Sequence, residues 1–131
     1  MIGNLFLGST ISPQDQNSFI IQDPNTVYSA LSYPAYISLD AGLTLSGVKE
    51  GSVNLSVLLK NVDGQELSTI TEQQQQFPVP EKGTNNRITI NGVLNLRKIA
   101  IPEPGIYSIA VKINDEEVTS ASFEAIQAEN E

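Results

Sequence analysis

The residue types that most often carry out catalysis are scarce in this sequence. It contains no cysteine and no histidine, which excludes a thiolate nucleophile, a serine–histidine triad and an imidazole zinc site within the chain. One nucleophile pattern remains, Ser46-x-x-Lys49, which is the spacing found in penicillin-binding enzymes. That chemistry needs the serine at the start of a helix, whereas Gly47 and Gly51 predict a loop between strands. We therefore expect no catalytic residue here.

The acidic residues leave open a cation site made of oxygen ligands alone. The segment Asn61–Glu66 resembles the start of a calcium loop, and Asp115, Glu116 and Glu117 lie at a second predicted turn. A true EF-hand loop has twelve residues between two helices, whereas Asn61–Glu66 reads as a turn between strands. Paired carboxylates for glycoside cleavage must face each other across a cleft. Strand alternation instead directs Asp40 outward, where we expect a solvated carboxylate. We expect no metal, no cofactor and no enzymatic activity.

The charge distribution limits the classes of partner. The formal net charge is −8, and beyond residue 99 the only basic residue is Lys112. An anionic surface is repelled by phosphate backbones and by anionic lipids, so we expect neither nucleic acid nor a membrane as a partner. The sequence begins with no signal-peptide pattern and contains no apolar segment of membrane-spanning length. The expected location is cytoplasmic, or the virion if the protein is a phage structural component.

Alternation of apolar and polar residues predicts strands. It is clearest in the segments 53–59, 107–113 and 37–45, where every second residue is apolar. Leu58 is an exception, because it is a large apolar residue at a position that the alternation directs outward. Strands with one apolar and one polar face are typical of antiparallel sheets. The 131 residues, of which 40% are hydrophobic, suffice for one domain, placed at 1–126 with a polar tail at 127–131. Strands are expected near residues 4–11, 18–22, 26–31, 35–45, 52–60, 66–72, 87–98, 106–113 and 118–126.

Turn residues separate these strands. Asp63-Gly64 and Asn114-Asp115 each lie between two predicted strands and favour hairpins. The run Gln73–Gln76, followed by Phe77 and two prolines, reads as a loop. Asn91-Gly92 is either a tight turn or a glycine bulge within one strand, and the alternation that continues across it favours the single strand. The fold class is therefore all-β, an antiparallel, immunoglobulin-like β-sandwich of about eight to nine strands.

One segment near the C-terminus resembles the tyrosine corner of immunoglobulin and fibronectin-type sandwiches. An acid, a small residue, a tyrosine and a buried residue follow one another at alternate positions, here Glu103, Gly105, Tyr107 and Ile109. Such a tyrosine buries its ring while its hydroxyl binds a nearby backbone carbonyl. The resemblance implies a structural role for Tyr107 and Gly105.

A further set of features extends over nearly the whole length of the chain: Ser32-Tyr33-Pro34-Ala35 before a long strand, Val62-Asp63-Gly64, Asn95-Leu96, the segment Ile101–Tyr107 and a closing hairpin at 111–118. In these features the chain resembles a family of small bacterial and phage-associated domains of unknown function, DUF6941. Because that family has no established activity, the resemblance implies an architecture and no catalytic residues.

The remaining candidates are surface features. Gln74 and Gln75 offer uncharged donors and acceptors beside Phe77, which we interpret as a partly exposed apolar anchor. Tyr33 and Tyr36 flank Pro34 and are suited to packing in a core or an interface. We predict a non-catalytic module that binds a protein partner or a second copy of itself. The alternatives are a virion or prophage structural component (tail, capsid decoration or receptor contact) and a small-ligand or carbohydrate binder.

Overall fold

The protein is described by a computed structural model, which covers residues 2–15, 18–24, 26–48, 52–76 and 88–128. The described residues form nine strands and no helix, as the alternation predicted. Within these ranges no helix of membrane-spanning length and hydrophobicity exists. The strands are β1 (Ile2–Asp15), β2 (Ser18–Pro24), β3 (Val27–Ala30), β4 (Ala35–Val48), β5 (Ser52–Asn61), β6 (Glu66–Gln76), β7 (Ile88–Ile101), β8 (Gly105–Ile113) and β9 (Glu116–Gln127).

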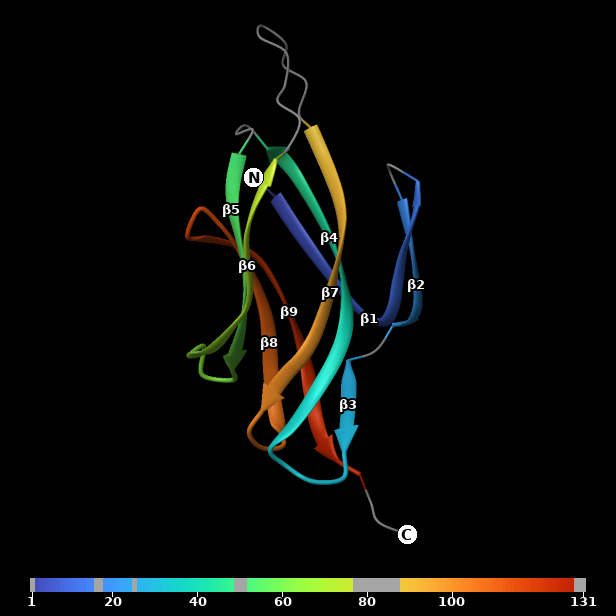
Figure 1. The fold of residues 1–131 in the computed structure, drawn as a ribbon, viewed down its shortest axis with the longest axis vertical. Coiled ribbons are helices and arrows are strands. Elements are labelled where there is room, and N and C mark those ends of the chain that lie inside the picture. The colour runs from blue at the N-terminus through green and yellow to red at the C-terminus, as the bar shows by residue number, and fades with distance from the viewer. Residues whose placement is uncertain (1, 16–17, 25, 49–51, 77–87, 129–131) are drawn as a thin grey trace, which may run out of the picture.

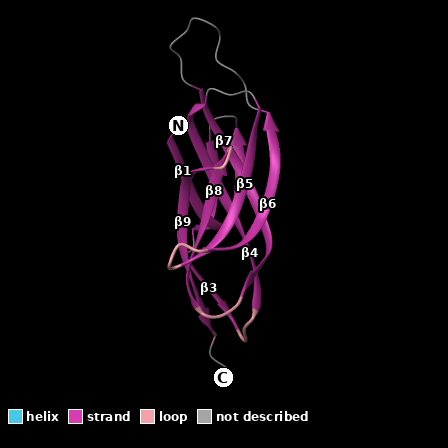
Figure 2. Ribbon diagram, turned by 90° about the vertical axis from the view of Figure 1, so that its left-hand side faces the viewer, coloured by secondary structure: helices cyan, strands magenta, loops and turns pink. Residues whose placement is uncertain are grey.

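The strands form two sheets that pack face to face, which confirms the predicted all-β sandwich (Figures 1 and 2). One sheet has the order β2-β1-β4-β7 and the other the order β3-β9-β8-β5-β6. The pairings are antiparallel except for β3 and β9, which run parallel. The predicted antiparallel arrangement does not hold for this pair, because alternation is typical of antiparallel sheets but does not determine the direction of a single short edge strand.

The core consists of the inward-facing residues of the central strands. On β5 and β8 these are the alternating residues that the sequence predicted, and they face the inward side chains of β1 and β4. Burial of this aliphatic surface is the main favourable term in folding. The largest fully buried side chains are Leu39, Leu45, Val57, Leu59, Leu96, Ile101, Ile109 and Val111.

Two residues on the outer face of the five-stranded sheet are buried as well. Leu58 and Ala110 are neighbours on β5 and β8, with exposed fractions of 6% and 0%. Lys60 and Lys112 lie on either side of this pair. Each lysine side chain extends across the pair, in opposite directions, to a glutamate on the other side. Lysine stems cover apolar surface while their ammonium groups stay in water, which accounts for the burial of Leu58. The ion pairs are Lys60–Glu117 and Lys112–Glu66.

Asp40 lies on the outer face of β4, but it is 4% exposed, so the expectation of a solvated carboxylate is wrong. Its Oδ2 accepts a hydrogen bond from the backbone N–H of Ile11 (2.9 Å), where β1 has left β4 to pair with β2. Its Oδ1 lies 3.0 Å from Nη2 of Arg97. Burial, and secondarily the Asp40 carboxylate, raises the pKa of the Tyr28 hydroxyl. The carboxylate therefore fastens the β1–β2 hairpin, which stands to one side of the sandwich in Figure 1.

The position of Arg97 depends on a bulge in β7. Arg97 and Lys98 together lie opposite Ser38, and Lys98 has a positive φ of 56°. The Arg97 guanidinium also donates to the carbonyl oxygen of Leu39 (3.1 Å). At Asn91-Gly92 the strand continues in regular register. The single-strand interpretation is therefore confirmed, but the bulge lies at Arg97-Lys98 and not at the glycine.

The run Gln73–Gln76 is part of β6, and its interpretation as a loop is wrong. These four residues pair in regular register with the first residues of β5. Glutamine is polar on both faces of a strand, so the alternation that reveals a strand is absent from this run. The strand therefore extends four residues beyond its predicted end.

Replacing Asp40 with alanine should destabilise the fold, because it leaves the Ile11 N–H without its acceptor and Arg97 without its carboxylate. We expect a loss of about 2–3 kcal/mol in the free energy of unfolding, measured by urea denaturation. The control Glu72→Ala removes an exposed carboxylate from β6 and should change stability by less than about 0.5 kcal/mol. Equal losses for both variants would contradict this role of Asp40.

The Lys112–Glu66 pair should be visible in a carboxyl titration. The hydrogen bond from Lys112 and then its charge lower the pKa of Glu66. Any stability that this carboxylate contributes is therefore present at neutral pH and is lost as the pH falls through the lowered pKa. Lys112→Met keeps the stem over Leu58 and should raise the pKa of Glu66 in an NMR titration. Lys98→Met should leave it unchanged, and an equal shift in both variants would refute the pairing.

Candidate functional site

One long side of the sandwich carries a pocket of about 310 Å³ between the two sheets. It lies where β6 ends one sheet and β7 ends the other, within the part of the chain that the structure describes. Its lining comes from four strands, β4 to β7. We call this feature the β6–β7 cleft. It is lined by Leu43, Leu45, Leu55, Gln73, Gln75, Gln76, Asn91, Gly92, Val93 and Leu94.

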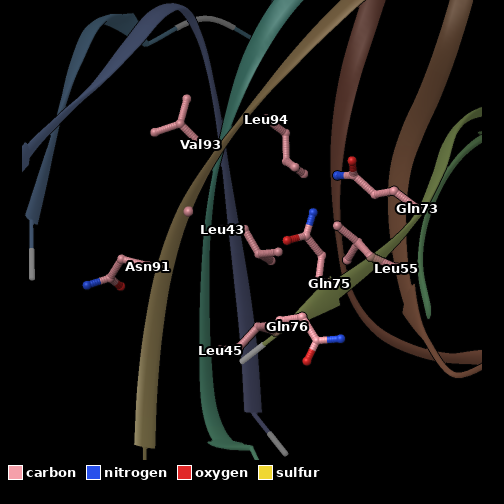
Figure 3. Close-up of a pocket in the computed structure, with 10 residues that line it drawn as sticks. Leu43, Leu45, Leu55, Gln73, Gln75, Gln76, Asn91, Val93 and Leu94 are labelled. Atoms are coloured by element: carbon pink, nitrogen blue, oxygen red, sulfur yellow. The ribbon is translucent and has the colours of Figure 1, made fainter. Parts of the chain in front are cut away.

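The cleft combines an apolar floor with amide side chains. Figure 3 shows Gln73 and Gln75 of β6 facing Leu43 and Leu94 across the pocket. The register explains this arrangement, because Gln73 pairs with the inward-facing Leu55 and Gln75 with the inward-facing Val53. The inward positions of this strand are therefore polar, although they face the leucines of the opposite sheet. Such a surface can bind backbone amides and aliphatic side chains together.

A glycine leaves room in the cleft. Gly92 lies on the inward side of β7, opposite Leu43, and a Cβ added to it would have no atom within 4 Å. On the opposite long side, Gly3 of β1 also faces inward, but a Cβ there would lie 3.1 Å from the Val118 carbonyl oxygen of β9. The two sheets therefore meet closely along β1 and β9 and stand apart along β6 and β7.

The edges beside the cleft are regular, whereas their other halves are bulged. On β6, residues 71–76 pair one to one with β5. Nearer the start of β6, Ile70 and Leu67 have no partner residue in β5 and form bulges. On β7, residues 89–96 pair one to one with β4, and the Arg97-Lys98 bulge follows. Bulges discourage the addition of a further strand to a sheet edge. The cleft thus lies between the two edge segments that lack this protection.

The predicted interaction residues do not form one surface. Gln74 and Gln75 lie near the end of β6, with Gln75 half-buried in the cleft and Gln74 exposed beside it. Tyr33 and Tyr36 lie at the opposite end of the sandwich, where the chain enters β4 (Figure 1). Phe77 is outside the described residues, so nothing is assigned to it.

The two tyrosines at the far end differ in their surroundings. The Tyr33 hydroxyl donates to the carbonyl oxygen of Ile126 (2.6 Å), and its ring packs against the core. Burial, and secondarily Tyr107, raises the pKa of the Tyr33 hydroxyl. Tyr36, in contrast, is 75% exposed. Tyr33 therefore holds the start of β4 against the end of β9, and Tyr36 is available at the surface.

Tyr107 makes the hydrogen bond of a tyrosine corner. Its ring is 4% exposed and stacks on Phe123, with 5.9 Å between centroids and 24° between planes. Its hydroxyl donates to the carbonyl oxygen of Glu103 (2.7 Å) across the turn between β7 and β8. A Cβ on Gly105 would lie 3.8 Å from the Tyr107 ring, which is ordinary contact. Steric room beside the ring therefore does not require glycine at position 105.

The other candidate patterns are accounted for by strands and turns. Ser46 lies in β4, and Lys49 is outside the described residues. The Asn61 side-chain oxygen accepts hydrogen bonds from the N–H groups of Asp63 and Gln65, both at 3.0 Å, and so closes the β5–β6 turn. The described residues bring together no group of three acidic side chains with the arrangement of a metal site.

The profile of the family of unknown function DUF6941 matches residues 25–126. The chain belongs to this family. The matched segment contains β3 to β9, whereas β1 and β2 precede it. No curated protein matches the DUF6941 chain in sequence.

Solved structures of two other proteins are similar to this DUF6941 protein over most of its length. A β-glucosidase from Listeria innocua, alone or with isofagomine, has 15% identity and a TM-score of 0.49, covering 95% of this chain and 16% of the glucosidase. The Pseudomonas fluorescens alkylpurine DNA glycosylase AlkC, bound to DNA containing an abasic site analog, has 14% identity and a TM-score of 0.38, covering 95% and 30%. The chain spans a small part of each protein.

Sequence reasoning named one lining residue, Gln75, but missed the cleft itself and the roles of Gln73 and Gly92 in this DUF6941 protein. The sequence predicts a turn or a bulge at Gly92, because glycine has a flexible backbone. In the structure, Gly92 matters because its missing side chain leaves open space in the cleft. The polar inward face of β6 was hidden because Gln73–Gln76 was read as a loop. One feature of the sequence could have indicated the strand: Gln73 and Gln75 are two residues apart, the same spacing as the inward-facing residues of β5 with which they pair.

Replacing Tyr107 with phenylalanine removes the hydroxyl and keeps the buried ring. We expect a loss of about 1 kcal/mol in the free energy of unfolding, because one partly buried hydrogen bond is lost. Chemical denaturation followed by circular dichroism measures it. Tyr36→Phe, at the exposed tyrosine, should be neutral within about 0.5 kcal/mol. A neutral Tyr107→Phe would show that the bond contributes nothing to stability.

Proposed function

We propose that this DUF6941 protein is a non-catalytic interaction module that captures a partner polypeptide at the β6–β7 cleft. The observation that supports this proposal is the coincidence of an apolar pocket with two regular sheet edges. An unprotected edge is prone to pairing with another chain, and natural proteins usually block it. Here the register shifts of both edge strands lie outside the segments that border the cleft.

The composition of the cleft favours a polypeptide ligand. Its described lining consists of leucine, valine, glycine, glutamine and asparagine, with no acidic or basic side chain. Leucines offer apolar contact, and the amides of Gln73 and Gln75 offer both donors and acceptors. A polypeptide presents these same two kinds of group, aliphatic side chains and backbone amides, at regular spacing.

A photo-crosslinking amino acid placed at Gln73 should test this function in an extract of the source cells. Gln73 lines the cleft, so we expect one crosslinked polypeptide of constant identity, established by mass spectrometry. The control position is Ser122, which is exposed on the outer face of β9 and does not line the cleft. The polypeptide crosslinked from position 73 should no longer be captured when the protein also carries Gly92→Leu. Identical products from Gln73 and Ser122 would overturn the proposal.

A further inference from the structure

The geometry of the cleft points to a particular binding mode. We propose that the β6–β7 cleft takes up an extended, uncharged segment of a second polypeptide, which pairs with the outer edge of β6 as an added strand. Alternate side chains of that segment, large and aliphatic, enter the space between the two sheets. This inference rests on the proposed function and deepens it by naming the chemistry of the partner.

The backbone of β6 is suited to an added strand over one segment. Residues 71–76 are in regular register with β5, and β6 is the last strand of its sheet among the described residues. At about 3.3 Å per residue, this segment is about 20 Å long, close to the length of a typical strand. An incoming segment can therefore form a full strand before it meets the bulge at Ile70.

The interior of the cleft explains the alternation. Side chains of a strand point to opposite faces in turn, so a strand added to β6 directs every second side chain toward β7. There it meets Leu43, Leu94 and the open space at Gly92. A volume of about 310 Å³ is at the small end of the range of about 300–1,000 Å³ for pockets that enclose whole small molecules. It suits a few aliphatic side chains delivered by a strand.

Charge determines the nature of the occupant. None of the ten lining residues is charged, and a charged group placed among the leucines would lose hydration without gaining a partner. The chain carries a net charge of −8, so two copies repel each other at long range. The described strands of a second copy are already part of its own sheets. The favoured occupant is therefore a neutral segment of a different protein.

The test uses blocked seven-residue peptides as probes. The first alternates threonine and leucine. The second has the same composition with adjacent leucines, and the third has glutamate in place of the central leucine. Fluorescence anisotropy should show that the alternating peptide binds at least ten-fold more tightly than the other two. Amide hydrogen exchange should slow in residues 71–76 of β6 and remain unchanged in β3, the edge strand at the other side of that sheet.

Two substitutions in β7, one inside the cleft and one outside it, provide the matched comparison. Gly92→Leu places a side chain in the open space, and no positive φ restricts that position. We expect at least a ten-fold loss of peptide binding, with the thermal unfolding temperature kept. Ala100→Leu places the same side chain at an exposed position near the other end of β7, which is not among the residues that line the cleft, and this variant should bind normally.

The outcomes separate this inference from the proposed function. Equal binding of all three peptides, exchange protection outside β6, or binding that survives Gly92→Leu would overturn strand addition. A homodimer of this protein in analytical sedimentation, present in the wild type and absent in Gly92→Leu, would show that the occupant is a second copy and not a different protein. If the Gln73 crosslink still captures one partner while no peptide binds, the interaction module stands and only this binding mode is refuted.

Discussion

Burial of the inward-facing aliphatic side chains of β4, β5 and β8 is the interaction on which the rest of the molecule depends. The sequence contains no cysteine, so no disulfide helps to hold the sheets together. The central leucines, isoleucines and valines are nearly inaccessible to solvent, and strand pairing extends the order outward to the edges. On β6 the inward positions beside the cleft are glutamine instead of leucine, and the two sheets are not packed closely together there. The cleft is the direct result of that change.

The strands were predictable wherever one face is apolar and the other polar. Alternation located β5 and β8, and the left-handed residues Asn114 and Asp115 form the hairpin turn that their types indicated. The same reasoning failed at Gln73–Gln76, where both faces are polar. It failed again at Asp40, because its burial comes from a hairpin far away in the sequence. Local patterns report which face a residue occupies, but not what covers that face.

The cleft was less predictable than the fold. One of its residues, Gln75, is predicted from the sequence as surface together with its neighbour Gln74, but as part of a loop beside Phe77. The contribution of Gly92 arises only when β7 stands opposite β6, a relation between strands in different sheets. No pattern within either segment encodes that relation. Geometry between sheets therefore had to come from the structure.

The bond that fastens the β1–β2 hairpin has an evolutionary consequence. The carboxylate of Asp40 belongs to the segment shared with the family, whereas the N–H of Ile11 belongs to a region that precedes it. Every residue type except proline supplies a backbone N–H. The sequence of the hairpin in this chain can thus change while its attachment persists, provided that Asp40 remains and position 11 is not proline.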